Sequence, residues 1–114
     1  MKTIIAGSRN IGNRSFLDAL AQCDWLEEVT VCISGTARGV DKWGESWAEW
    51  NDIPIMRFPA DWRAFGRGAG MVRNKLMADH ADALIAIWDG ESPGTANMIA
   101  VAKAQGLKVE VILA

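Results

Sequence analysis

The fold of this chain is decided by residues 29–41, which read VTVCISGTARGVD. The run begins with five β-branched or apolar residues, which are typical of a strand. A turn with two glycines follows, and a helical pattern starts directly after it. A strand, a short glycine turn and a helix in immediate succession predict one βα unit of a parallel α/β sheet.

The same turn, Ser34 to Asp41, has the chemistry of an anion site. Its backbone N–H groups are expected to point outward, in front of the positive end of the helix dipole, an arrangement that suits phosphate. Gly35 and Gly39 flank Thr36 and allow a ligand to approach the backbone closely. Arg38 adds a planar cation that binds phosphate or carboxylate through two parallel hydrogen bonds. An ordinary βα turn that needs glycine only for its geometry is the alternative interpretation.

The pattern of strand, turn and helix continues along the whole chain. We expect strands at 2–6, 29–33, 54–58, 83–88 and 108–113, and helices at about 14–24, 40–50, 73–80 and 95–105. The continuous apolar run at 83–88 is typical of a strand covered on both faces. The sequence therefore predicts a single Rossmann-like domain over residues 1–114: a doubly wound, parallel five-stranded α/β sheet with helices on both faces. If the strands lie in the order 3-2-1-4-5, the winding of the sheet reverses between strands one and four, and ligands are expected to bind at the carboxyl ends of these two strands.

Three loops of the predicted fold carry glycine together with Ser or Thr, and they follow strands one, two and four. With the start of the third helix they give the expected ligand- and phosphate-binding residues: Gly7, Ser8, Arg9, Gly35, Thr36, Arg38, Gly39, Arg73, Asn74, Trp88, Asp89, Gly90, Gly94 and Thr95. Trp88 is expected either to lie against a base or ribose, or to belong to the core. Pro59 to Gly70, long for a βα connection, is expected to be a lid or binding loop.

Composition narrows the class of protein. Half of the 114 residues are hydrophobic and 23% are charged, with a formal net charge of −2, which argues against a strongly electrostatic nucleic-acid binder. Cys23 and Cys32 suggest buried thiols in a reducing compartment, and we expect a cytoplasmic protein. No run approaches the roughly 18 apolar residues of a membrane span. We expect no cofactor and no metal site, because one histidine and two separated cysteines form no ligand cluster.

Two further features have a structural and a functional interpretation. Val40, Trp43, Trp47 and Trp50 are spaced along one side of the second helix, with Glu45 and Glu49 on the other. The tryptophans form either a base-stacking platform or a bulky stripe packed on the sheet or on a second copy of the chain, as in a homo-oligomer. The single histidine, His80, falls at a predicted helix end and is expected to have a capping or packing role.

These residues together resemble the SLOG superfamily, Rossmann-like domains that include the Lonely Guy enzymes and the DNA-processing protein DprA. The resemblance covers nearly the whole chain and points to the YspA/cpYpsA-related branch, which occurs in phage and bacterial genomes. Ser34 to Asp41 is similar to the Ser-Gly-x-Ala-x-Gly-(Ile/Val)-Asp segment of the DprA side. Arg73-Asn74-Lys75 resembles the family's Arg-Asn-Arg helix start, and Gly94-Thr95 its Gly-Gly-x-Gly-Thr loop.

One departure from the family pattern bears on activity. The catalytic glutamate of the phosphoribohydrolases is replaced by Met98, and a thioether neither polarises water nor stabilises an oxocarbenium-like state. Asp41, Asp89 or Glu91 could supply a carboxylate instead, although we expect Asp41 to order the start of its helix.

Three functions follow from the resemblance. The first is binding or sensing of a nucleotide-derived ligand. The second is cleavage of a nucleoside monophosphate or related N-glycoside, for which Asp89 and Glu91 are weak catalytic candidates. The third is DprA-like binding of single-stranded DNA through Arg63, Arg67, Arg73 and Lys75. Nucleic acid is the less favoured partner because the net charge is negative.

Overall fold

A computed structural model describes all residues from 1 to 114 and contains a five-stranded sheet in the order β3-β2-β1-β4-β5. Every neighbouring pair is parallel. The strands are β1 (Lys2–Gly7), β2 (Val31–Ser34), β3 (Ile55–Arg57), β4 (Ala83–Trp88) and β5 (Lys108–Leu113). The predicted fold class and strand order are thereby confirmed.

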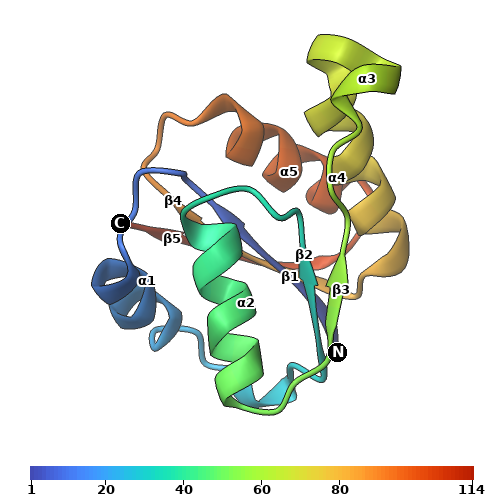
Figure 1. Ribbon diagram of the computed structural model, residues 1–114. Coiled ribbons are helices and arrows are strands. Elements are labelled where there is room, and N and C mark those ends of the chain that lie inside the picture. Colours follow the sequence, from blue (N-terminus) through green and yellow to red (C-terminus); the bar gives the residue numbers. More distant parts are fainter.

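The helices pack in two layers, one on each face of the sheet (Figure 1). They are α1 (Asn13–Leu20), α2 (Val40–Trp50), α3 (Trp62–Phe65), α4 (Ala69–His80) and α5 (Pro93–Ala104), with short 3-10 turns at Leu26–Glu28 and Gly66–Gly68. The first layer consists of α1 and α2, and the second of α4 and α5. None of the helices combines the length and the apolar character needed to cross a membrane.

The two central strands, β1 and β4, are buried on both faces. Ile5 and Ile85 pack in the cluster beneath α1 and α2, whereas Ile4 and Leu84 pack in the cluster beneath α4 and α5, and all four are fully buried. Alternate side chains of a strand point to opposite faces, so a strand with a core on each side needs an unbroken apolar run. Each such side chain contributes about 1.5–3 kcal/mol of hydrophobic free energy on burial.

The tryptophan stripe of α2 packs mainly inside the molecule. Trp43 and Trp47 lie against the α1/α2 cluster, and the Trp43 indole donates a hydrogen bond to the Ile11 carbonyl at 2.9 Å. Trp50, at the end of the helix, is 89% exposed. Packing within the domain therefore holds for Trp43 and Trp47, and Trp50 lies outside this packing.

The segment from Pro59 to Gly70 differs from the expected irregular loop. It contains α3, the second 3-10 turn and the first two residues of α4, so that α4 begins at Ala69 and not at Arg73. The Asp61 carboxylate caps α3 by accepting the Ala64 N–H at 3.0 Å, which explains why a glycine-rich stretch becomes helical. In Figure 1, α3 projects beyond the body of the domain.

His80 ends α4, as expected. Its Nδ1 lies 2.8 Å from the Leu76 carbonyl oxygen, and its ring packs at 5.3 Å from the Phe58 ring. These contacts hold the imidazole against the last turn of α4 and the Phe58 ring, so the expected capping or packing role is confirmed.

Candidate functional site

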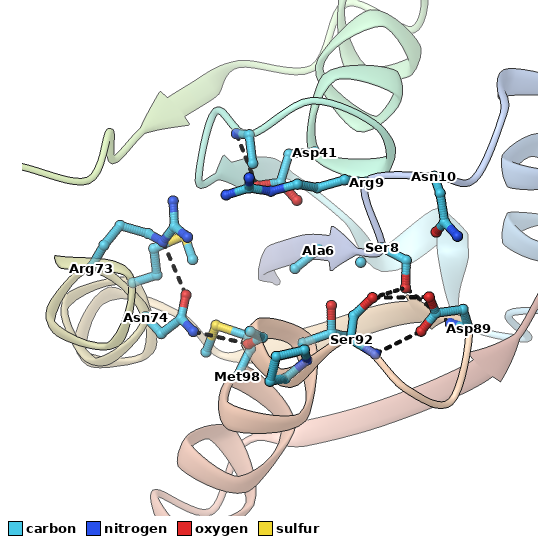
Figure 2. Close-up of a pocket in the computed structure, with 16 residues that line it drawn as sticks. Ala6, Ser8, Arg9, Asn10, Asp41, Arg73, Asn74, Asp89, Ser92 and Met98 are labelled. Carbon is cyan, nitrogen blue, oxygen red and sulfur yellow. Dashed lines mark hydrogen bonds between the residues drawn. The ribbon is translucent and has the colours of Figure 1, made fainter. Parts of the chain in front are cut away.

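A pocket of about 430 Å³ lies where β1 and β4 end, at the point where the winding of the sheet reverses (Figure 2). Its walls come from the end of β1, from the β1–α1, β2–α2 and β4–α5 loops, and from residues of α2, α4 and α5. Of the predicted residues, those lining it are Gly7, Ser8, Arg9, Arg73, Asn74, Asp89, Gly94 and Thr95. The predicted residues outside its lining are Gly35, Thr36, Arg38, Gly39, Trp88 and Gly90. Asn10, Asp41, Ser92 and Met98 line it in addition.

The β1–α1 and β4–α5 loops are held together through Ser8. This side chain is buried; its Oγ accepts the Asp89 N–H at 3.0 Å and lies 3.1 Å from the Ser92 Oγ. We expected the Ser8 hydroxyl to bind phosphate. In the structure it takes part in this loop network while the residue lines the pocket, so its contact with a phosphate stays a prediction.

Asp89 organises the β4–α5 loop. Its Oδ1 accepts the backbone N–H groups of Ser92 at 2.8 Å and Glu91 at 2.9 Å, and its Oδ2 accepts the Ser92 hydroxyl at 3.0 Å. These donors, the Ser92 N–H first among them, lower the pKa of Asp89 to about 2. Asp89 is therefore ionised and engaged in shaping its loop, and it is a weak base at neutral pH.

The N-terminus of α5 supplies free donors to the pocket. The Gly94 and Thr95 backbone N–H groups have no acceptor in the protein, as is usual for the first turn of a helix. Thr95 lines the pocket and is 5% exposed, and its hydroxyl is accessible and makes no hydrogen bond within the protein. Since these groups sit at the positive end of a twelve-residue helix, this corner suits an anion.

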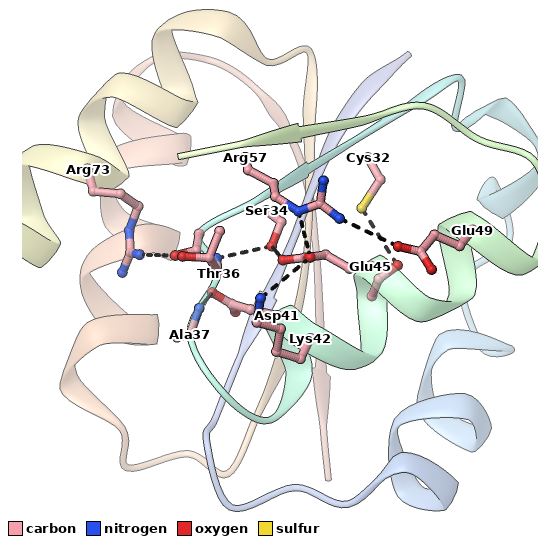
Figure 3. Close-up of polar contacts among 12 residues, drawn as sticks. Cys32, Ser34, Thr36, Ala37, Asp41, Lys42, Glu45, Glu49, Arg57 and Arg73 are labelled. Carbon is pink, nitrogen blue, oxygen red and sulfur yellow. Dashed lines mark hydrogen bonds and ion pairs between the residues drawn. The ribbon is translucent and has the colours of Figure 1, made fainter. Parts of the chain in front are cut away.

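The β2–α2 loop, which contains the residues labelled Thr36 and Ala37 in Figure 3, has a strained and crowded backbone. Thr36 has a φ of 63°, a left-handed conformation that is unfavourable for a β-branched residue. A Cβ atom on Gly35 would lie 2.7 Å from Arg73 Nη1 and 2.8 Å from Asp41 Oδ2. One on Gly39, whose φ is 78°, would lie 2.6 Å from the backbone of the β1–α1 loop. Both glycines thus allow other parts of the protein to approach closely, and the expected approach of a ligand to them stays a prediction.

Asp41 has both the expected role and an unexpected position. Its Oδ2 accepts the Ala37 N–H at 3.2 Å, so it orders the start of α2 as predicted. It also lines the pocket, is 5% exposed and forms no ion pair. Burial raises its pKa to about 6, against the opposing effects of the Ala37 N–H and Arg73.

Arg73 is positioned by its neighbour in the sequence. The Asn74 side chain accepts the Arg73 Nε–H at 3.0 Å and donates to the Gly94 carbonyl at 3.2 Å and to Asn97 Oδ1 at 2.9 Å. Arg73 Nη1 donates to the Gly35 carbonyl at 2.5 Å. Burial lowers the pKa of Arg73, while Asp41 opposes that change. Asn74 therefore orients the Arg73 guanidinium, and the remaining N–H donors of the guanidinium are available to the pocket.

Other candidate residues lie elsewhere. The Trp88 indole donates to the Ser92 carbonyl at 3.1 Å, and the ring packs on the α4/α5 cluster, as in the core interpretation. Arg38 and Glu91 are exposed and outside the pocket lining.

The basic residues considered for DNA binding have different surroundings. Arg63 lies on α3 and Arg67 on the 3-10 turn after it. Lys75 pairs with Asp79 at 3.4 Å, and Arg73 turns into the pocket.

The sheet order and the pocket at its switch point define an α/β domain with a Rossmann-like binding crevice. A family model described as the YspA, cpYpsA-related SLOG family matches residues 1–65, more than half of the chain, and the chain belongs to this family. The matched part includes the β1–α1 and β2–α2 loops. Searches among curated proteins and among solved structures found no match.

Proposed function

We propose that the pocket binds a nucleotide or nucleotide-derived anion, and that the protein acts as a binding or sensing domain. The observation that carries this proposal is the set of unpaired donors at α5: the Gly94 and Thr95 amides and the hydroxyl of Thr95, a residue that lines the pocket. Membership of the SLOG family is consistent with nucleotide-related binding. The volume of about 430 Å³ is within the range of small-molecule pockets.

The proposed pose follows from the distribution of charge and apolar surface. A phosphate rests on the amides at the start of α5, with Arg9 and Arg73 as its cations. Ala6, Met77 and Met98 provide apolar surface for the rest of the ligand. Asp89, held in its own loop, does not compete for the phosphate position.

A nucleotide panel tests the proposal directly. Nucleoside mono- and diphosphates, cyclic nucleotides and ADP-ribose are added to the protein, and thermal unfolding is followed. A ligand present at 100 times its Kd should add about 2.7 kcal/mol to the free energy of unfolding. If no member of the panel raises Tm, the nucleotide proposal is wrong.

Two arginine variants distinguish a direct contact between Arg73 and the ligand from a general effect of positive charge on binding. Arg73→Ala is expected to raise the Kd of the best ligand about 10- to 150-fold, the equivalent of roughly 1.5–3 kcal/mol for a charge-assisted hydrogen bond. Arg38→Ala removes the same charge outside the pocket and should leave Kd within about twofold. Calorimetry at fixed salt measures both, and circular dichroism verifies folding. Equal losses in the two variants would contradict a direct contact by Arg73.

The same pocket is not expected to hydrolyse nucleoside 5′-monophosphates efficiently. Met98, buried in the pocket wall, supplies no carboxylate; Asp89 is a weak base, and Glu91 lies outside the lining. Loss of one acid–base group typically costs about 10²- to 10⁴-fold in rate. Chromatographic assay of released base should show no sustained turnover. Multiple turnovers that disappear in Asp89→Asn, Glu91→Gln or Asp41→Asn would instead identify an enzyme.

A further inference from the structure

Asp41 presents an unpaired charge to the pocket. Its Oδ2 accepts the Ala37 N–H, the Gly7 N–H also favours the ionised form, and the carboxylate forms no ion pair although the residue is 5% exposed. Burial of an ionised carboxylate without a partner costs free energy. A neutral Asn would accept the Ala37 N–H equally well, so the ordering of the loop does not account for the charge.

None of the charged groups around Asp41 forms an ion pair with it. Arg73 approaches from α4 over Gly35, and Arg9 extends beside it from the β1–α1 loop (Figure 2). Glu45, one helical turn along α2, is engaged by the Ser34 hydroxyl at 2.6 Å and by Arg57 at 2.9 Å. Asp89 lies across the pocket in its own loop. None of these groups donates a hydrogen bond to Asp41.

The pocket therefore has two chemically distinct sides. Figure 2 shows Asp41 on one side and Ser92, the residue before α5, on the other. The α5 side offers N–H and O–H donors, which suit an anion, whereas the opposite side offers the Asp41 carboxylate as a charged acceptor, with Arg73 and Arg9 beside it. A ligand that fits both has an anionic group and, separated from it, one or two hydroxyl donors. A ribose 5-phosphate unit has this arrangement, and its neighbouring 2′- and 3′-hydroxyls can both donate to one carboxylate.

We propose that Asp41 recognises the ribose hydroxyls of the bound ligand, so that the pocket takes ribonucleotides and rejects analogues without these hydroxyls. This inference rests on the proposed nucleotide function and adds a specificity residue to it. Rejection is expected to be strong because an analogue without hydroxyls covers Asp41 and leaves a buried acceptor unpaired.

The discrimination should depend on pH. Since burial raises the pKa of Asp41 to about 6, the free protein holds this group largely protonated at pH 5 and ionised at pH 7.5. Hydroxyl donors favour the ionised form, so ribose binding should release a proton below pH 6 and weaken as the pH falls. A phosphate monoester also titrates near pH 6. That effect cancels in the ratio of two ligands with the same phosphate.

The experiment compares the four ribonucleoside 5′-monophosphates with their 2′,3′-dideoxy counterparts by calorimetry at pH 7.5, 6 and 5. The ribonucleotide should bind at least about tenfold more tightly at pH 7.5, and this ratio should fall toward one at pH 5. Asp41→Asn should show a small ratio that does not change with pH. Glu49→Gln, which removes an exposed acid from the same helix, should retain the wild-type ratio.

The outcomes distinguish this inference from the function on which it rests. If both members of each pair bind equally at pH 7.5, the role of Asp41 is wrong and nucleotide binding stands. If no member of any pair binds, the proposed function and the inference both fall. If Asp41→Asn does not fold, the pH dependence of the wild-type ratio decides: a ratio that is constant between pH 7.5 and 5 contradicts the proposal.

Discussion

Asp41→Asn is expected to raise the free energy of unfolding at pH 7.5 by about 3 kcal/mol. The pKa of Asp41 is raised from 3.8 to about 6 in the folded protein, and each unit corresponds to about 1.4 kcal/mol. Between these two values the folded state binds more protons than the unfolded state, so stability from this group falls as pH rises. The penalty is absent below pH 3.8 and complete above about pH 6.

Urea unfolding of the two proteins between pH 4 and 7.5 measures this effect. The difference in free energy of unfolding should be largest at pH 7.5 and close to zero at pH 4. Glu45 and Asp89, whose pKa values are lowered, lose stabilising interactions in acid in both proteins, so their effects cancel. A difference that stays constant with pH, or a less stable variant, would contradict the description of Asp41 as a buried, unpaired acid. An Asp41→Asn variant that is more stable but no longer distinguishes ribonucleotides from dideoxynucleotides would show that the charge is retained for binding.

Gly7→Ala is expected to destabilise the protein by at least about 3 kcal/mol. The added Cβ would lie 1.9 Å from the Ile87 carbonyl oxygen and 2.9 Å from the Val40 Cβ. Gly7 pairs with Ile87 in the register of β1 and β4, and the Ser8 N–H donates to the same carbonyl at 3.1 Å. Because the clash is with backbone, the two central strands must separate to relieve it, and overpacking of this kind is at the severe end of point substitutions.

Gly68→Ala is the matched control. No atom lies within 4 Å of its added Cβ, and its φ of −81° is accessible to alanine. The variant should be neutral or more stable by up to about 1 kcal/mol, because alanine reduces the freedom of the unfolded chain. Denaturant unfolding of both variants makes the comparison. Gly7→Ala with a stability equal to that of Gly68→Ala would mean that β1 and β4 do not approach as closely as described.

The sequence was sufficient to predict the sheet because the apolar runs and the glycine turns agree with each other. It failed between Pro59 and Gly70, where three glycines suggested an irregular loop. There the Asp61 cap starts α3 and the tertiary structure extends α4 by a turn. The burial of Glu45 was also missed, because its partners, Ser34 and Arg57, come from two different strands and only the fold brings them together.

The site was predictable as a set of loops but less so as a set of side chains. The carboxyl ends of parallel strands share one edge, so loops after β1 and β4 had to meet. Whether a given side chain in those loops is free or occupied depends on contacts between loops. Ser8 and Asn74 are occupied, and Asp41 is open to the pocket, for reasons that lie in distant segments. The position of Thr95 was easier to predict, because it lies in the first turn of α5 and so depends on a local pattern of sequence.

The order of the strands has a consequence for how the protein is made. β1 leaves the ribosome before the other four strands, yet one of its two neighbours is β4, and Ile5 faces Ile85 across that pairing. A nascent chain that ends before β4 exposes one edge of β1 and lacks α5. Completion of the sheet must therefore wait for the synthesis of β4, and it depends on contacts between segments far apart in the chain, which are slow to form. Until then the hydrophobic first strand is a segment that chaperones would be expected to shield.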